Sequence, residues 1–84
     1  MKNVDLRRWE ISSWIFTFGC GQTHEGRYIR IYACDYDEAR AEMIRRYGTE
    51  WAFQYSEQEW NEWLQHKPEW VPLETELETI YIGK

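Results

Sequence analysis

The sequence predicts an α+β fold: a small antiparallel sheet with a ββαβ core, a second short helix and a C-terminal strand. Two early segments have strand composition and flank a glycine-rich loop. Two later segments begin with a helix-capping pattern and carry apolar residues at helical spacing. A chain of 84 residues has the length of one domain, so residues 1–84 are predicted to form a single domain.

The first two strands are predicted at residues 14–18 and 27–32, as a β-hairpin. Their connection, residues 19–26, contains three glycines and exceeds a two-residue turn, which predicts a shaped loop with positive-φ residues. Cys20 and Cys34 then fall at opposite ends of the hairpin, about 20 Å apart at the usual strand rise. A disulfide cannot span that distance, and reduced thiols are typical of a cytosolic protein.

The first helix is predicted over residues 36–47, because Asp35 is a capping residue with an acid three positions on and Gly48 follows the last apolar position. A second, short helix should start after Ser56, which repeats the capping pattern, and stop before Pro68. Residues 51–55, between the two helices, alternate aromatic and other residues, so a third strand is predicted there.

A final strand is predicted over residues 73–82, where polar and apolar residues alternate. In a regular strand, Glu74, Glu76 and Glu78 would share one open face at a spacing of about 6.6 to 7 Å. This spacing is comparable to that of phosphates along nucleic acid. The row could therefore mimic nucleic acid, or it could be a charged sheet face that keeps the protein soluble.

The net charge of −5 is distributed unevenly. Residues 1–48 carry eight Lys/Arg against seven Asp/Glu, whereas residues 49–84 carry two against eight. This acidity makes direct nucleic-acid binding an unfavoured expectation. No stretch approaches 18 uninterrupted apolar residues, and the first residues lack the apolar core of a signal peptide. We therefore expect a cytoplasmic protein with no membrane partner.

The acidic, aromatic C-terminal half is the first candidate binding site. Aromatic residues make up 18% of the chain, and the surplus that a small core cannot bury would suit a binding face. The alternative is a core built from large residues. The predicted partner-binding residues are Glu74, Glu76, Glu78, Glu59, Glu62, Trp60 and Trp63.

The loop at residues 19–26 is the second candidate site. It places a thiol, an imidazole, a carboxylate and an amide among glycines, whose backbone N–H groups can hold a small anion. With its flanking residues, the predicted ligand-binding set is Gln22, His24, Glu25, Arg27 and Arg30. The alternative is a loop whose polar side chains satisfy its own backbone.

Catalytic and metal-binding roles are not predicted. A Cys-His nucleophile pair needs a third group to orient the imidazole, and one loop rarely supplies it. The cysteines and histidines match no standard zinc spacing. We expect no catalytic residues, no metal and no cofactor.

Part of the chain resembles a family of small uncharacterised proteins carried by phages and prophages of Gram-positive bacteria. The likeness covers residues 14–56, and the first dozen residues and the acidic tail lie outside it. The residues that carry it are 14–22, His24-Glu25-Gly26, 37–40, Met43, Tyr47-Gly48 and 51–56. The resemblance implies a small accessory phage protein in the host cytoplasm, where inhibitors of host defence, including anti-CRISPR proteins, are common.

Together these observations lead to two functional hypotheses. The first is a non-enzymatic protein that binds and inhibits a host defence or nucleic-acid-handling protein, such as a CRISPR effector, through the acidic, aromatic surface. The second is a sponge for a small ligand such as a nucleotide signal, with the 19–26 loop as its site. A homo-oligomer would supply the pocket that the sponge needs, because a chain of this size encloses little volume.

Overall fold

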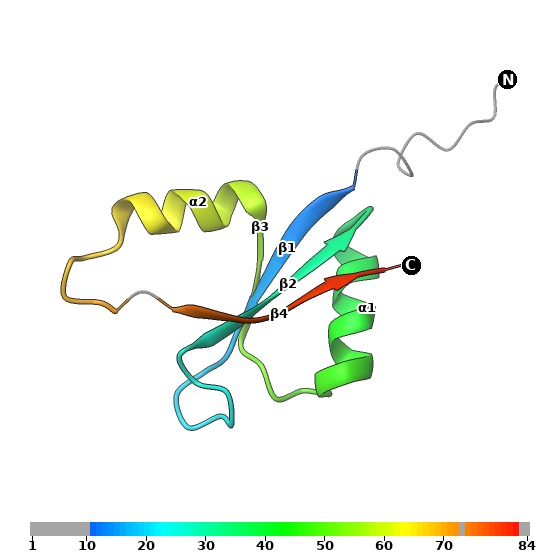
Figure 1. Cartoon of the computed structure of the whole chain (residues 1–84), viewed down its shortest axis with the longest axis horizontal. Helices are drawn as coiled ribbons and strands as arrows, with labels where there is room; N and C mark the ends of the chain where they lie inside the picture. The colour runs from blue at the N-terminus through cyan, green and yellow to red at the C-terminus, as the bar shows by residue number, and fades with distance from the viewer. Residues whose placement is uncertain (1–10, 73, 83–84) are drawn as a thin grey trace, which may run out of the picture.

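The computed structural model, which describes residues 11–72 and 74–82, is an α+β fold with a four-stranded mixed sheet (Figure 1). The predicted fold class and its ββαβ core are confirmed. The elements in chain order are β1 (Ser12–Thr17), β2 (Arg27–Ala33), α1 (Tyr36–Tyr47), β3 (Phe53–Ser56), α2 (Glu57–His66) and β4 (Thr75–Tyr81). The strand order is β3-β1-β2-β4, so the hairpin lies at the centre of the sheet. Predictions for residues 1–10 and for residue 73 fall outside the described residues.

The hairpin forms as predicted. β1 and β2 pair antiparallel from Ser12↔Ala33 to Thr17↔Tyr28. The connecting loop contains two glycines with positive φ, Gly21 at 87° and Gly26 at 86°, a region that glycine adopts without steric cost. The loop side of the hairpin thus has the backbone conformation that its glycines predict.

The sheet is mixed rather than wholly antiparallel, because β4 pairs parallel to β2. Both β2 and β3 run antiparallel to β1. The chain then returns through α2, so β4 enters the sheet in the same direction as β2 and β3 (Figure 1). A helical crossover of this kind is how parallel strands are connected. The alternation of residues 73–82 predicts a strand but not its direction.

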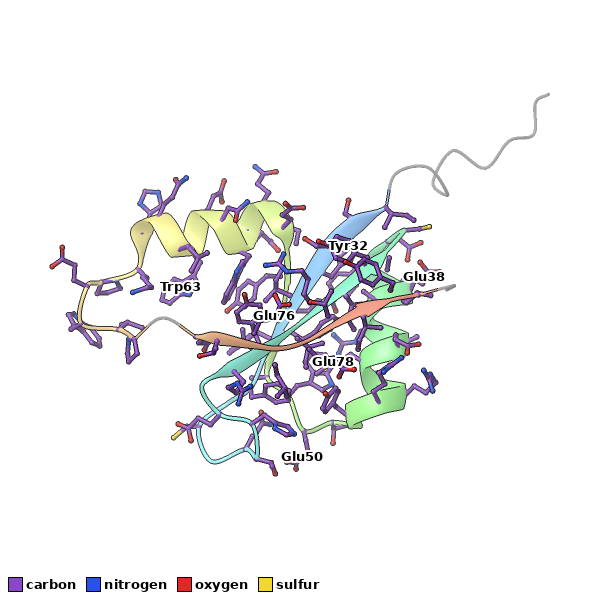
Figure 2. The ribbon with its side chains drawn as sticks, in the orientation of Figure 1. Tyr32, Glu38, Glu50, Trp63, Glu76 and Glu78 are labelled. Atoms are coloured by element: carbon purple, nitrogen blue, oxygen red, sulfur yellow. The ribbon has the colours of Figure 1, made fainter. Side chains whose placement is uncertain are left out.

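A β-bulge interrupts the pairing of β4 with β2. Tyr28 pairs with Glu76, but the next residue, Ile29, pairs with Glu78, so Leu77 is the extra residue in β4. Because one extra residue reverses the alternation of a strand, Glu76 and Glu78 lie on opposite faces of the sheet (Figure 2). The predicted continuous row of glutamates is therefore wrong, since that prediction assumed a regular strand.

The two helices cover opposite faces of the sheet. The core under α1 is built from alternate residues of the three longer strands together with two residues of the helix. Its buried members are Phe16, Phe18, Ile29, Ile31, Ala33, Ala39, Met43 and Ile80. Under α2, the ring of Trp60 lies 5.1 Å from Tyr28 and 5.7 Å from Tyr55, centroid to centroid. Both tyrosines belong to the face that points away from α1.

Both helices begin at the predicted caps. The Asp35 carboxylate accepts a hydrogen bond from the backbone N–H of Glu38, 2.8 Å away. At α2, Ser56 and Glu59 form a reciprocal capping box, in which each side chain accepts from the other's backbone N–H. These contacts are local in sequence, which explains why the helix starts were predicted correctly.

Candidate functional site

The acidic helix α2 and the loop that follows it form the most exposed acidic segment of the described chain. Glu57, Glu59 and Glu62 are exposed along the helix, and Glu69 is exposed in the loop. Lys67, at the start of this loop, donates from its Nζ to the backbone carbonyl of Val71 at 2.6 Å. The loop backbone therefore fixes the position of this cation. We define the α2 surface by its exposed acidic and aromatic residues: Glu57, Glu59, Glu62, Trp63, Glu69 and Trp70.

A hollow of about 690 Å³ lies between α2 and the start of β1. The charged residues that line it are Glu57 and Glu62, alongside polar side chains such as Gln58 and Asn61. Among the described residues that line the hollow, both charges are carboxylates, which favour a positively charged guest such as a lysine or arginine side chain. The geometry therefore suits insertion of a basic side chain from a partner.

Of the two tryptophans predicted to contact a partner, only Trp63 is on the surface. Trp63 is 40% exposed, whereas Trp60 is 3% exposed. Trp60 belongs to the core between α2 and the sheet, so a partner cannot reach it. The two residues share the apolar stripe of the helix, and only the position of the sheet decides which is covered.

Trp70 is a candidate contact residue that the sequence reasoning did not select. It is 82% exposed, in the loop between α2 and β4. The available signal was its place between Pro68 and Pro72, which exclude it from a helix and from a regular strand. A tryptophan in such a loop has little chance of burial, and an exposed tryptophan is a frequent binding hot spot.

Glu59 and Glu62 are both at the surface but differ in their contacts. The Glu59 Oε1 accepts from the Ser56 backbone N–H at 2.9 Å, so this carboxylate also stabilises the start of α2. Glu62 has only a long contact, 3.4 Å, from the Gln58 side-chain amide. Glu62 is therefore the better residue for separating binding from helix stability.

The three glutamates of the predicted row have three different environments. Glu76 accepts from Arg30 Nε at 3.1 Å, and its hydrogen bonds with Thr79 and then Arg30 lower its pKa. Glu78, on the other face, accepts from the Tyr47 hydroxyl at 2.7 Å. Glu74 has a buried Oε1 that finds no hydrogen-bond partner among the described residues, and burial raises the pKa of its carboxyl. The structure therefore does not bring the three together as one surface.

We expect Glu74→Gln to raise the melting temperature at neutral pH. A raised pKa means that the folded state favours the protonated carboxyl, so the stability it contributes is lost as pH rises through that pKa. Glutamine keeps the shape and removes the buried charge. Calorimetry at pH 7 and at about pH 3, where glutamate is largely protonated, checks this: the gain should appear only at pH 7. Glu62→Gln is the exposed control, and an equal gain there would contradict the explanation.

Tyr47 should be among the last tyrosines to ionise. Burial, and then the hydrogen bond to Glu78, raise its pKa to about 12. Because the folded-state pKa is raised above the ordinary 10.0, this contribution to stability is present below pH 10 and is lost as pH rises from 10 to about 12. Absorbance titration of wild type and Tyr47→Phe identifies the group. In Glu78→Gln the pKa should fall, and an unchanged value would contradict the assigned cause.

The polar side chains of the 19–26 loop are largely used by the loop itself. Gln22 Oε1 accepts from the Gly19 backbone N–H at 2.5 Å, and Glu25 Oε1 accepts from the Gly21 backbone N–H at 3.1 Å. These contacts fit the alternative to ligand binding, in which the polar side chains of the loop satisfy its own backbone.

The remaining residues of the predicted ligand set do not converge. The His24 ring packs edge-on against Tyr47 of α1, with centroids 5.7 Å apart. Arg30 lies on the other face of the sheet, where it donates to Glu76 and to the Ser13 hydroxyl. Arg27 is exposed at the start of β2. The structure therefore does not place Arg30 with His24 in one site.

Within residues 11–72 and 74–82, three or more potential metal ligands do not gather at any point. Neither helix in this described part is long and apolar enough to cross a membrane. No protein-family model, curated protein or solved structure matches the chain, so its function must be inferred from these contacts.

Proposed function

We propose that this chain is a non-enzymatic binding protein that inhibits a nucleic-acid-handling protein, such as a host defence effector, by covering its basic surface. The observation that carries the proposal is the acidic hollow beside α2, lined by Glu57 and Glu62. It lies on a helix whose remaining glutamate is also exposed, and the loop that follows adds Glu69 and the exposed Trp70.

Charge supports a basic partner. Residues 57–70 carry four glutamates and one lysine, and that lysine, Lys67, already bonds to the loop backbone. Proteins that bind nucleic acid neutralise phosphates with lysine and arginine. An acidic surface is complementary to such residues, speeds association and competes with nucleic acid for the same groups.

Aromatic exposure supports tight contact rather than charge steering alone. Trp63 and Trp70 offer large, rigid apolar area next to the carboxylates, and tryptophan is enriched among residues whose loss costs most binding energy. The resemblance of residues 14–56 to phage and prophage proteins supports the inhibitory context. The α2 surface lies outside that resemblance, so the support for its role comes from its charge and exposed rings alone.

The test is a pull-down of the tagged protein from a lysate of a Gram-positive bacterium, analysed by mass spectrometry for proteins and for bound nucleotides. We expect a stoichiometric protein with a basic surface, released by rising salt because charge attracts it. A co-purifying phosphate-bearing small molecule without a protein would contradict the proposal and favour the sponge hypothesis. Trp70→Ala is the matched variant, since it keeps the charge and should still weaken capture.

A further inference from the structure

A second candidate surface lies between α1 and the edge strand β3, away from the α2 surface. It is a groove of about 360 Å³. Its main lining residues are Tyr36, Arg40, Ile44, Trp51, Phe53 and Gln54. Its volume is at the low end for ligand sites, which suits a few side chains better than a large cofactor.

Apolar side chains are unusually exposed in this groove. Tyr36 and Ile44 of α1 are each 46% exposed, and Phe53 of β3 is 63% exposed. The Phe53 ring lies on the other face of the sheet, 6.3 Å from the Tyr55 ring, so β3 lines the groove there with its backbone. An isolated exposed apolar residue needs no explanation, but Tyr36 and Ile44 lie two turns apart on one side of α1 and open into the same hollow, which favours an interaction site.

The strand that forms one wall of the groove has an open edge. β3 lies at the end of the sheet, and within the described residues it pairs with β1 alone. The backbone N–H and C=O groups on the other side of an edge strand can pair with an added strand. With four residues, β3 offers a length of about 13 Å, enough for about four residues of an extended peptide.

The groove contains one unneutralised cation. Among the described residues that line it, Arg40 alone is charged. Its guanidinium lies 4.9 Å from the centre of the Trp51 ring, and its Nη1 donates to the Tyr36 hydroxyl at 3.3 Å. The neighbouring Arg45 and Arg46 are instead paired with Glu42, whereas Arg40 has no carboxylate within ion-pair distance in the described part of the chain.

We propose that this groove binds an extended peptide of a partner protein, in which an acidic residue stands between apolar ones. The peptide adds a strand to β3, its apolar side chains contact Tyr36 and Ile44, and its carboxylate pairs with Arg40. Charge selects this occupant: the protein carries a net charge of −5, yet the groove presents a cation held on aromatic rings. A basic peptide would instead be expected at the α2 surface.

The test uses a phage-displayed library of random peptides about twelve residues long, selected on the immobilised wild-type protein, followed by fluorescence anisotropy with the enriched peptide. We expect enrichment of an acidic residue with apolar residues two positions before and after it, because alternate side chains of a strand share a face. Arg40→Glu should weaken binding by about tenfold or more, because it replaces attraction with repulsion. Arg45→Glu is the matched control on the same helix, with the same change of charge, and should leave binding unchanged.

A second variant and a change in the peptide keep the test independent of the fold of Arg40→Glu. Ile44→Gln removes an exposed apolar side chain from the groove and should also weaken binding. N-methylation of successive peptide amides should weaken binding at every second position, because an added strand directs alternate amides toward β3.

The proposal is overturned by a library without enriched acidic peptides or by equal effects of Arg40→Glu and Arg45→Glu. It is also overturned by a concentration-dependent dimer that buries Tyr36 and Ile44, which would make a second copy the occupant. Binding abolished by Glu62→Lys and unaffected by Arg40→Glu would also assign the peptide to the α2 surface. None of these results would remove the support for the function proposed above.

Discussion

Trp60→Ala should remove a large part of the stability of this domain. The ring is 3% exposed and contacts Tyr28 and Tyr55, so it is the main apolar connection between α2 and the sheet. Truncating a buried tryptophan to alanine costs about 3 to 5 kcal/mol. A domain of 84 residues has a total free energy of unfolding of roughly 4 to 12 kcal/mol. The variant is therefore expected to lose at least about a quarter of the free energy of unfolding and to unfold at a clearly lower urea concentration.

Urea unfolding followed by far-ultraviolet circular dichroism measures this loss. The matched control is Trp70→Ala, since the same side chain is removed from a position that is 82% exposed. We expect the control to remain within about 0.5 kcal/mol of wild type. Equal losses in the two variants would contradict the packing of α2 against the sheet. The pair also separates the tryptophan that stabilises the fold from the one proposed to bind.

Features with local causes could be predicted from the sequence. The bounds of α1 match residues 36–47 because Asp35 caps its start and Gly48, with φ 62°, ends it. The start of α2 follows from the Ser56 capping box in the same way. Each signal lies within a few residues of the feature that it predicts, so no knowledge of the tertiary structure is needed.

Features that depend on distant partners could not be predicted. The direction of β4 follows from the path through α2, and its bulge arises where it meets Tyr28 and Ile29 of β2. The alternation from Glu74 to Glu78 fits a regular strand, so the pattern itself gave no sign of an extra residue. That single residue transfers Glu78 to the α1 face, where it bonds Tyr47. The predicted row of glutamates on one face therefore does not form.

The candidate site was predicted in part. Glu59 and Glu62 are exposed on α2, as expected for a polar helix face. Periodicity selected Trp60 and Trp63 equally, because residues three apart share a side of a helix. Only the sheet decides that Trp60 is covered. Trp70 had no periodic pattern around it, and its exposure follows from the loop that the two prolines enforce.

Reversing two charges of the α2 surface should slow association with the captured partner by about tenfold or more. The variant is Glu62→Lys with Glu69→Lys, both at exposed positions outside the capping box. The control is Asp37→Lys with Glu50→Lys, also exposed. Figure 2 shows Glu50 well away from Trp63. Each pair replaces two negative charges with two positive ones, so both variants change the net charge from −5 to −1.

Association and dissociation rates from interferometry, measured at low and at high salt, distinguish the contribution of the carboxylates from that of the exposed tryptophan. Steering by carboxylates acts on the association rate and weakens as salt shortens the Debye length. Trp70→Ala should instead raise the dissociation rate, because a packed ring acts after encounter. If both charge pairs slow association equally, the attraction belongs to the whole molecule, and α2 has no special role. If only the α2 pair does so, the attraction belongs to the α2 surface, and Glu62→Lys alone then shows whether the hollow that Glu62 lines takes part.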